Sequence, residues 1–98
     1  RSSAFIIGAL SMLKFKIVKS VLILSNNALT VEINENNKTI AYITNDKRFI
    51  ESLYVNRLSS LYRALDLLTL SENKSQQDVN DLLARHVSNV ESIAQQAS

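Results

Sequence analysis

The middle of the chain alternates apolar and polar positions with the two-residue period of a β-strand. Apolar side chains fall at every second position of residues 29–33, and short β-branched runs occupy residues 21–24 and 40–43. The first of two intervening asparagine clusters, Asn26 and Asn27, can adopt the left-handed backbone of a tight turn. Because short polar turns join consecutive strands most simply in antiparallel pairs, the pattern predicts a three-stranded antiparallel meander.

In the second half of the chain the period changes to that of a helix. Apolar residues recur there at steps of four and three, which is typical of a helix packed along another helix. The first stripe comprises Tyr54, Leu58, Leu61, Leu65 and Leu68, widened by Phe49, Ile50 and Leu53, and the second comprises Val79, Leu83, His86, Val90 and Ile93. We expect two helices of about 22 and 20 residues, which form a hairpin or continue to a partner.

Capping residues stand at the expected starts of both helices. Thr44, Asn45 or Asp46 can cap the first helix by accepting a hydrogen bond from its free backbone N–H groups. Ser75, followed by Asp78, resembles a capping box directly before the second apolar stripe. We therefore expect a short polar segment to connect the two helices.

The N-terminal segment fits two periods. Apolar residues at helical spacing form one stripe, which comprises Ile6, Leu10, Leu13, Ile17 and Val21. Alternation of Leu13, Phe15 and Ile17 with Lys14 and Lys16 fits a half-buried strand instead. We expect a helix over residues 3–19, with strand pairing from residue 12 onward as the alternative.

These elements predict an α+β fold with an N-terminal helix, a three-stranded antiparallel meander and two C-terminal helices. Residues 1–98 are expected to form a single interaction domain, either complete or a fragment of a larger protein. The apolar run at residues 4–24 has the length of a membrane span, but it contains three lysines, each of which costs about 2.5–3.5 kcal/mol at mid-bilayer. We therefore expect no transmembrane helix.

Composition removes several classes of function. With one glycine, no proline and no cysteine in 98 residues, the chain lacks glycine-rich phosphate loops, disulfides and thiolate metal sites. The net charge of +2 is unevenly distributed, because residues 1–31 hold four basic and no acidic residues, whereas residues 32–98 hold seven basic and nine acidic residues. The absence of cysteine leaves the cellular compartment undetermined.

Candidate chemistry is sparse. His86 is the single histidine, and without cysteine it cannot supply the usual zinc ligand set. Its place in the second stripe favours a hydrogen-bonded histidine at an interface over a general base or a metal ligand. A metal site formed by Asp78, Asp81 and Glu72 is the weaker alternative. The sequence predicts no catalytic residue, no metal, no cofactor and no small-molecule substrate.

Charged residues along the first predicted helix fall at spacings that suit ion pairs. Arg48 can pair with Glu51, and Arg63 with Asp66, each three residues apart. Ordinary pairing on the helix surface is the expected role of these residues, and contact with nucleic acid is the alternative.

The chain also carries more apolar surface than a small domain easily buries. Leu67 and Leu70 lie off the first stripe, and the N-terminal segment adds Phe5, Ile7 and Phe15. Apolar area left in water costs about 25 cal/mol per Å², and a small domain has little stability to spare. We therefore expect a non-catalytic protein–protein interaction or assembly module, which oligomerises or docks into a larger complex through the two stripes.

Two other modes of binding remain open. The strands expected at residues 29–33 and 40–43 contain no proline and no run of lysines, so their edges could accept a partner strand. Alternatively, Lys14, Lys16 and Lys19 could bind an anion, which would suit a small basic nucleic-acid-binding dimer of the nucleoid type.

Overall fold

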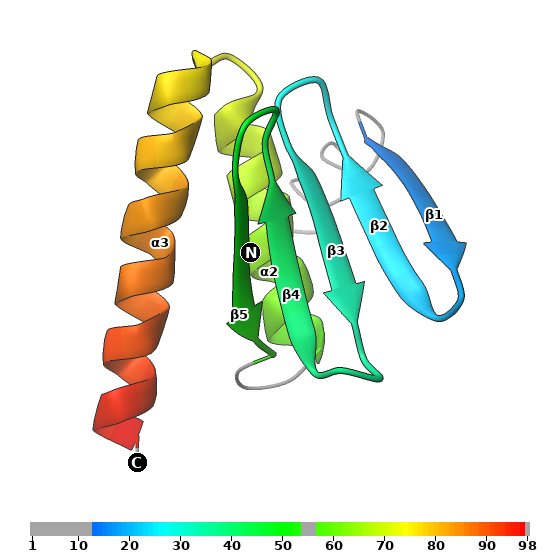
Figure 1. The fold of residues 1–98 in the computed structure, drawn as a ribbon, viewed down its shortest axis with the longest axis vertical. Helices are drawn as coiled ribbons and strands as arrows, with labels where there is room; N and C mark the ends of the chain where they lie inside the picture. The colour runs from blue at the N-terminus through cyan, green and yellow to red at the C-terminus, as the bar shows by residue number, and fades with distance from the viewer. Residues whose placement is uncertain (1–12, 54–56, 98) are drawn as a thin grey trace.

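The structure is a computed structural model that describes residues 13–53 and 57–97. Five antiparallel strands form one sheet in the order of the sequence, and two helices follow (Figure 1). The elements are β1 (Lys14–Val18), β2 (Val21–Ser25), β3 (Thr30–Asn34), β4 (Thr39–Ile43), β5 (Arg48–Ser52), α2 (Arg57–Ser71) and α3 (Gln76–Ala97). The mixed α+β class and the antiparallel sheet are confirmed, but the sheet has five strands rather than three.

The expected N-terminal helix over residues 3–19 is wrong where the structure describes it. Residues 14–18 form strand β1, which pairs with β2 so that Phe15 faces Leu24 and Ile17 faces Leu22. Alternation of lysine with apolar residues, together with β-branched Ile17, fits a strand better than a helix. Residues 3–12 of the expected helix lie outside the described residues.

The three strands of the predicted meander are present as β2, β3 and β4, each within one residue of its expected ends. Their edges are not free, however, because β3 and β4 are interior strands that pair on both sides. Strand addition at residues 29–33 or 40–43 is therefore wrong. Among the described strands, the edges of the sheet belong to β1 and β5.

Strand β5 is the second correction. The first helix does not begin near Asp46 but at Arg57, and residues 48–52 form a strand instead. Thr44 caps no helix, because it lies between β4 and β5 and its hydroxyl donates to Asn80 Oδ1 of α3 at 3.1 Å. The start of the second helix is confirmed, since the N–H of Asp78 donates to Ser75 Oγ at 3.2 Å.

The turns differ from the expectation that asparagine would supply left-handed backbone. Positive φ occurs at Lys19 (51°) and Ser20 (69°), which form the two-residue turn between β1 and β2. Asn26 instead acts through its side chain, because its Oδ1 accepts from the N–H groups of Ala28 and Leu29. Its Nδ2 donates to the Leu68 carbonyl oxygen at 2.6 Å, which anchors the β2–β3 turn to α2.

Both helices pack on one side of the sheet. Helix α2 contacts β3, and α3 contacts β5 (Figure 1). Between the helices and the sheet lies the buried core, which includes Leu24, Val31, Ile33, Ile40, Tyr42, Leu65, Leu68, Val79 and Leu83. The opposite side of the sheet, here called the open face, is not covered by either helix. Neither described helix is long and apolar enough to cross a membrane.

The register of the sheet aligns the core-facing side chains in two rows that run from β5 to β1. The first row is Phe49, Tyr42, Val31, Leu24 and Phe15, and the second is Glu51, Ile40, Ile33, Leu22 and Ile17. Because the helices contact β3 and β5, the side chains of the rows are buried in the middle of the sheet and exposed to solvent at β1. Phe15 is 63% exposed there and Ile17 is 68% exposed.

Candidate functional site

A buried polar cluster joins four elements of the fold. It consists of Tyr42 on β4, Glu51 on β5, Arg63 on α2 and His86 on α3. The Tyr42 hydroxyl donates to Glu51 Oε1 at 3.0 Å, and Arg63 Nη1 donates to the same oxygen at 2.6 Å. The His86 ring packs edge-on against the Tyr42 ring, with centroids 6.0 Å apart. These contacts tie both helices to the strands.

Burial controls the protonation of this cluster. It raises the pKa of Tyr42, and the neighbouring Glu51 carboxylate adds to that rise. Burial also raises the pKa of Glu51, although hydrogen bonding from Tyr42 and the charge of Arg63 oppose the shift. For His86, burial and then the charge of Arg63 lower the pKa to about 4. His86 is therefore neutral at pH 7.

Two buried atoms of the cluster lack a hydrogen-bond partner: Glu51 Oε2 and His86 Nε2. The hydrogen bond expected for the histidine is therefore not formed at Nε2, and the His86 ring packs against the Tyr42 ring instead. The surface pair expected between Arg48 and Glu51 is wrong, because Glu51 pairs with Arg63 and Arg48 pairs with Glu32. The hydrogen bonds of Tyr42 and Arg63 to Glu51 therefore hold the members of the cluster to one another.

The neutral state of His86 predicts a pH dependence of stability. The unfolded chain binds the proton with the ordinary pKa of 6.5 and the folded chain with a pKa of about 4. The unfolded state therefore binds more protons between these values, and the free energy of unfolding falls as the pH is lowered through this window. We expect urea unfolding between pH 7 and pH 4 to show this loss, and the H86F variant, which keeps an aromatic contact with Tyr42, to lose the larger part of it.

The control for this measurement is the E51Q background. The raised pKa of Glu51 acts in the opposite sense, because the folded state then binds its proton more tightly and its contribution falls as the pH rises above 4.5. Comparing E51Q with E51Q/H86F removes the contribution of Glu51 to the pH dependence of stability. Identical pH profiles of the two proteins would show that His86 does not titrate in this way.

The structure places much of the two predicted stripes inside the chain's own core. Leu65, Leu68, Val79 and Leu83 are buried there, and Leu61 packs partly buried against them. Leu58 is the stripe residue that remains open, with 56% of its surface exposed. Tyr54 lies outside the described residues, as do the side chains of Val90 and Ile93. Whether the open members contact a partner stays a prediction.

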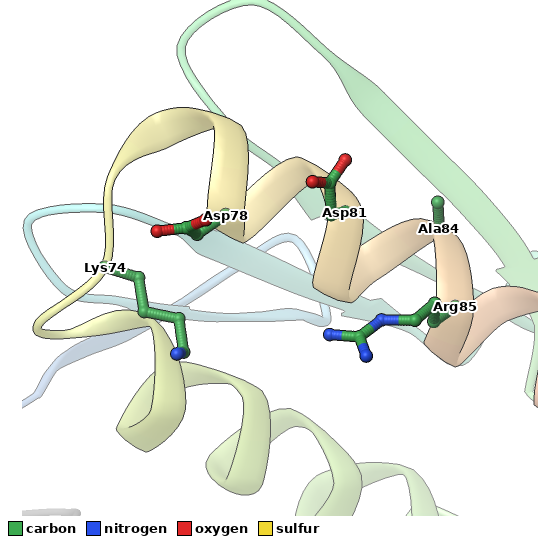
Figure 2. Close-up of a pocket in the computed structure, with 5 residues that line it drawn as sticks. All are labelled: Lys74, Asp78, Asp81, Ala84 and Arg85. Carbon is green, nitrogen blue, oxygen red and sulfur yellow. The ribbon is translucent and has the colours of Figure 1, made fainter.

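A groove of about 590 Å³ runs along the exposed side of α3 near its N-terminus (Figure 2). It is lined by Lys74, Asp78, Asp81, Ala84 and Arg85. Figure 2 shows the Arg85 side chain extending toward the side of Lys74. Asp81 Oδ1 accepts from Gln77 Nε2 at 3.0 Å. Among the described residues, no three histidine or carboxylate side chains lie close enough together to hold a metal ion.

The open face of the sheet carries a second hollow of about 460 Å³. Its apolar lining comprises Val18, Val21, Ile23, Ala41 and Ile50. An ion pair crosses this face, because Arg48 Nη2 lies 3.0 Å from Glu32 Oε1. Ile50 is 58% exposed beside it. Five apolar side chains therefore gather on a face that no described helix covers.

Strand β1 brings together the predicted anion-binding lysines and the largest exposed apolar side chains. We call this set the β1 surface; it comprises Lys14, Phe15, Lys16, Ile17, Val18 and Lys19, all of which are exposed. Within the described part of the chain, none of its three lysines forms an ion pair. The alternation in the sequence was the signal for this arrangement, since it places the lysines of β1 on one face and Phe15 with Ile17 on the other.

No protein-family model matches the chain, and the searches of curated proteins and of solved structures found no significant match either.

Proposed function

We propose that the chain is a non-catalytic protein–protein interaction module that binds a partner through the β1 surface. The observation that carries this proposal is the end of the two core-facing rows, where Phe15 and Ile17 are 63% and 68% exposed. These rows are buried under the helices elsewhere in the sheet. A partner placed beside β1 would continue the same core.

The energetic case rests on the size of these side chains. Burying a phenylalanine or isoleucine side chain contributes about 1.5–3 kcal/mol relative to exposure. A partner that covers the exposed surface of Phe15 and Ile17 therefore gains a large part of this free energy from each side chain. Val18, with 43% exposure, adds apolar surface on the other face of β1. Exposed apolar residues that cluster in this way, next to charged groups, are typical of interaction sites.

Photo-crosslinking tests this proposal at single-residue resolution. A benzophenone amino acid at position 17 is expected to yield a discrete adduct in the cells that produce the protein, because Ile17 would lie within the interface. The same probe at Asn89, which is exposed on α3, serves as the matched control and is expected to yield none. The F15D change should abolish the adduct at position 17 while the circular dichroism spectrum stays unchanged. Absence of an adduct at position 17 would contradict the proposal.

A small nucleic-acid-binding protein is the second candidate, because Lys14, Lys16 and Lys19 follow one another along β1 and its turn without ion pairs to acidic side chains among the described residues. Phosphate contacts through these lysines would make the affinity fall steeply with salt. Such binding would be lost in K14E/K16E and kept in I17T. The interaction module instead predicts that I17T weakens binding of the partner, because Phe15 and Ile17 are then the decisive side chains.

A further inference from the structure

Within residues 13–53 and 57–97, the backbone groups on the outer edge of β1 have no strand partner. Among the described residues, β1 pairs with β2 alone. The two-residue turn implies a hydrogen-bonded pair between Val18 and Val21, and such pairs alternate with non-bonded pairs along an antiparallel ladder. The N–H and C=O groups of Phe15 and Ile17 therefore point away from β2. They are available to a further strand.

The side chains of β1 give this edge a defined chemical pattern. Phe15 and Ile17 lie on the face that the helices cover elsewhere, whereas Lys14 and Lys16 lie on the open face with Ile23 as the neighbour of Lys16. A strand placed beside β1 would present alternate residues to these two faces. Its residues on the helix side would meet apolar side chains, and those on the open face would meet ammonium groups.

We propose that β1 accepts an extended segment of a partner protein in which acidic and apolar residues alternate, by strand addition at its outer edge. This inference rests on the proposed function and names the class of partner. Main-chain hydrogen bonds to Phe15 and Ile17 supply the affinity, and the acidic side chains select the segment through Lys14 and Lys16.

A second copy of the chain fits this edge less well. Antiparallel pairing of all five residues of β1 with those of a second β1 places Lys16 directly opposite the Lys16 of the other copy. Like charges directly opposite each other destabilise a strand pair. An acidic segment places a carboxylate at that position instead, so charge complementarity favours it over self-association.

Nucleic acid also fits the edge incompletely. Phosphates could approach Lys14 and Lys16 on the open face, but they would leave Phe15, Ile17 and the backbone edge uncovered. A strand in which acidic and apolar residues alternate contacts the lysines, the apolar side chains and the backbone edge at once. The lysines of β1 then act as a selective element, since charged residues on an edge strand also discourage pairing with unsuitable strands.

The test uses a short fluorescent peptide that alternates glutamate and valine, titrated with the full chain at low salt and followed by anisotropy. A peptide that alternates lysine and valine controls for charge, and one with the same glutamates and valines in two blocks controls for alternation. We expect only the first peptide to bind. Equal binding of the blocked peptide would overturn strand addition, and equal binding of the lysine peptide would overturn selection by charge.

Variants of β1 separate the contributions of charge and backbone. K14E/K16E is expected to weaken binding of the glutamate–valine peptide about tenfold, whereas K47E/K74E, the same charge change at exposed lysines outside β1, should not. I17P removes the outward N–H of residue 17. I17T removes a similar amount of apolar surface but keeps that N–H. Strand addition predicts a larger loss for I17P than for I17T. Equal losses would overturn it.

Hydrogen–deuterium exchange of the wild-type chain provides a readout that does not depend on any variant folding. The amides of Phe15 and Ile17 should exchange rapidly in the free chain and become protected when the peptide binds. Protection before the peptide is added would overturn the proposal, because the edge would already be paired. Crosslinks at position 17 together with no peptide binding would leave the interaction module standing and overturn only the acidic strand.

Discussion

Replacing Arg63 by methionine lowers the free energy of unfolding at pH 7 by about 3 kcal/mol, because it leaves the buried carboxylate of Glu51 without its cation. The Glu51 side chain is 6% exposed and that of Arg63 is 14% exposed, so water cannot take over the lost contact. Proton uptake by Glu51 limits the loss, since its pKa is already raised by burial and would rise further without Arg63. Urea unfolding should therefore show a smaller loss at pH 5 than at pH 8.

Two comparisons make this result specific to the buried pair. R48M is the matched control, because it breaks the Arg48–Glu32 pair, whose side chains are 51% and 30% exposed, and such exposed pairs contribute about 0–1 kcal/mol. The double variant R63M/E51Q should lose clearly less than the sum of the two single losses. Additive losses, or equal losses for R63M and R48M, would show that the cluster does not act as a unit.

Shortening Leu83 to alanine is the second change with a large expected effect. Leu83 is fully buried and belongs to the core formed by α2, α3 and the sheet. Removing a buried leucine side chain costs about 2–5 kcal/mol, because transfer energy is lost and a cavity remains. Of the α3 residues whose burial is described, the buried ones are Val79, Asn80 and Leu83. The docking of α3 therefore depends strongly on this one side chain.

Chemical denaturation followed by circular dichroism measures this loss as a change in midpoint at a constant slope. L70A is the matched control, since Leu70 lies on α2 with 52% of its surface exposed, and the same chemical change there should cost well under half as much. A loss in L83A no larger than in L70A would contradict the placement of α3 against the sheet.

The central meander was predictable because its signal is local. Residues of β3 alternate cleanly between Val31 and Ile33 on the core side and polar residues on the open face, so the two-residue period is visible in the sequence. The start of α3 was equally visible through Ser75, whose hydroxyl oxygen accepts from the N–H of Asp78. In both places the residue pattern and the local hydrogen bonding specify the same element.

Strand β5 and the buried cluster were missed for one reason. Glu51 faces the core and Ile50 faces outward, which inverts the usual relation between polarity and burial. The inversion is possible because Arg63 and Tyr42 satisfy the buried carboxylate from α2 and β4. Such a contact joins residues distant in the sequence, so a periodic pattern of apolar residues cannot predict it. Strand β1 was ambiguous because its apolar side chains are exposed on both faces of an edge strand.

The order of the sheet also bears on how quickly the chain reaches its native state. Because each described strand pairs only with the strands next to it in the sequence, each hairpin closes a short loop, and the entropy lost on closure is small. Low contact order of this kind accelerates folding relative to sheets whose neighbouring strands are distant along the chain. The hairpins can thus form in succession during synthesis, before the ribosome has released the residues of α3.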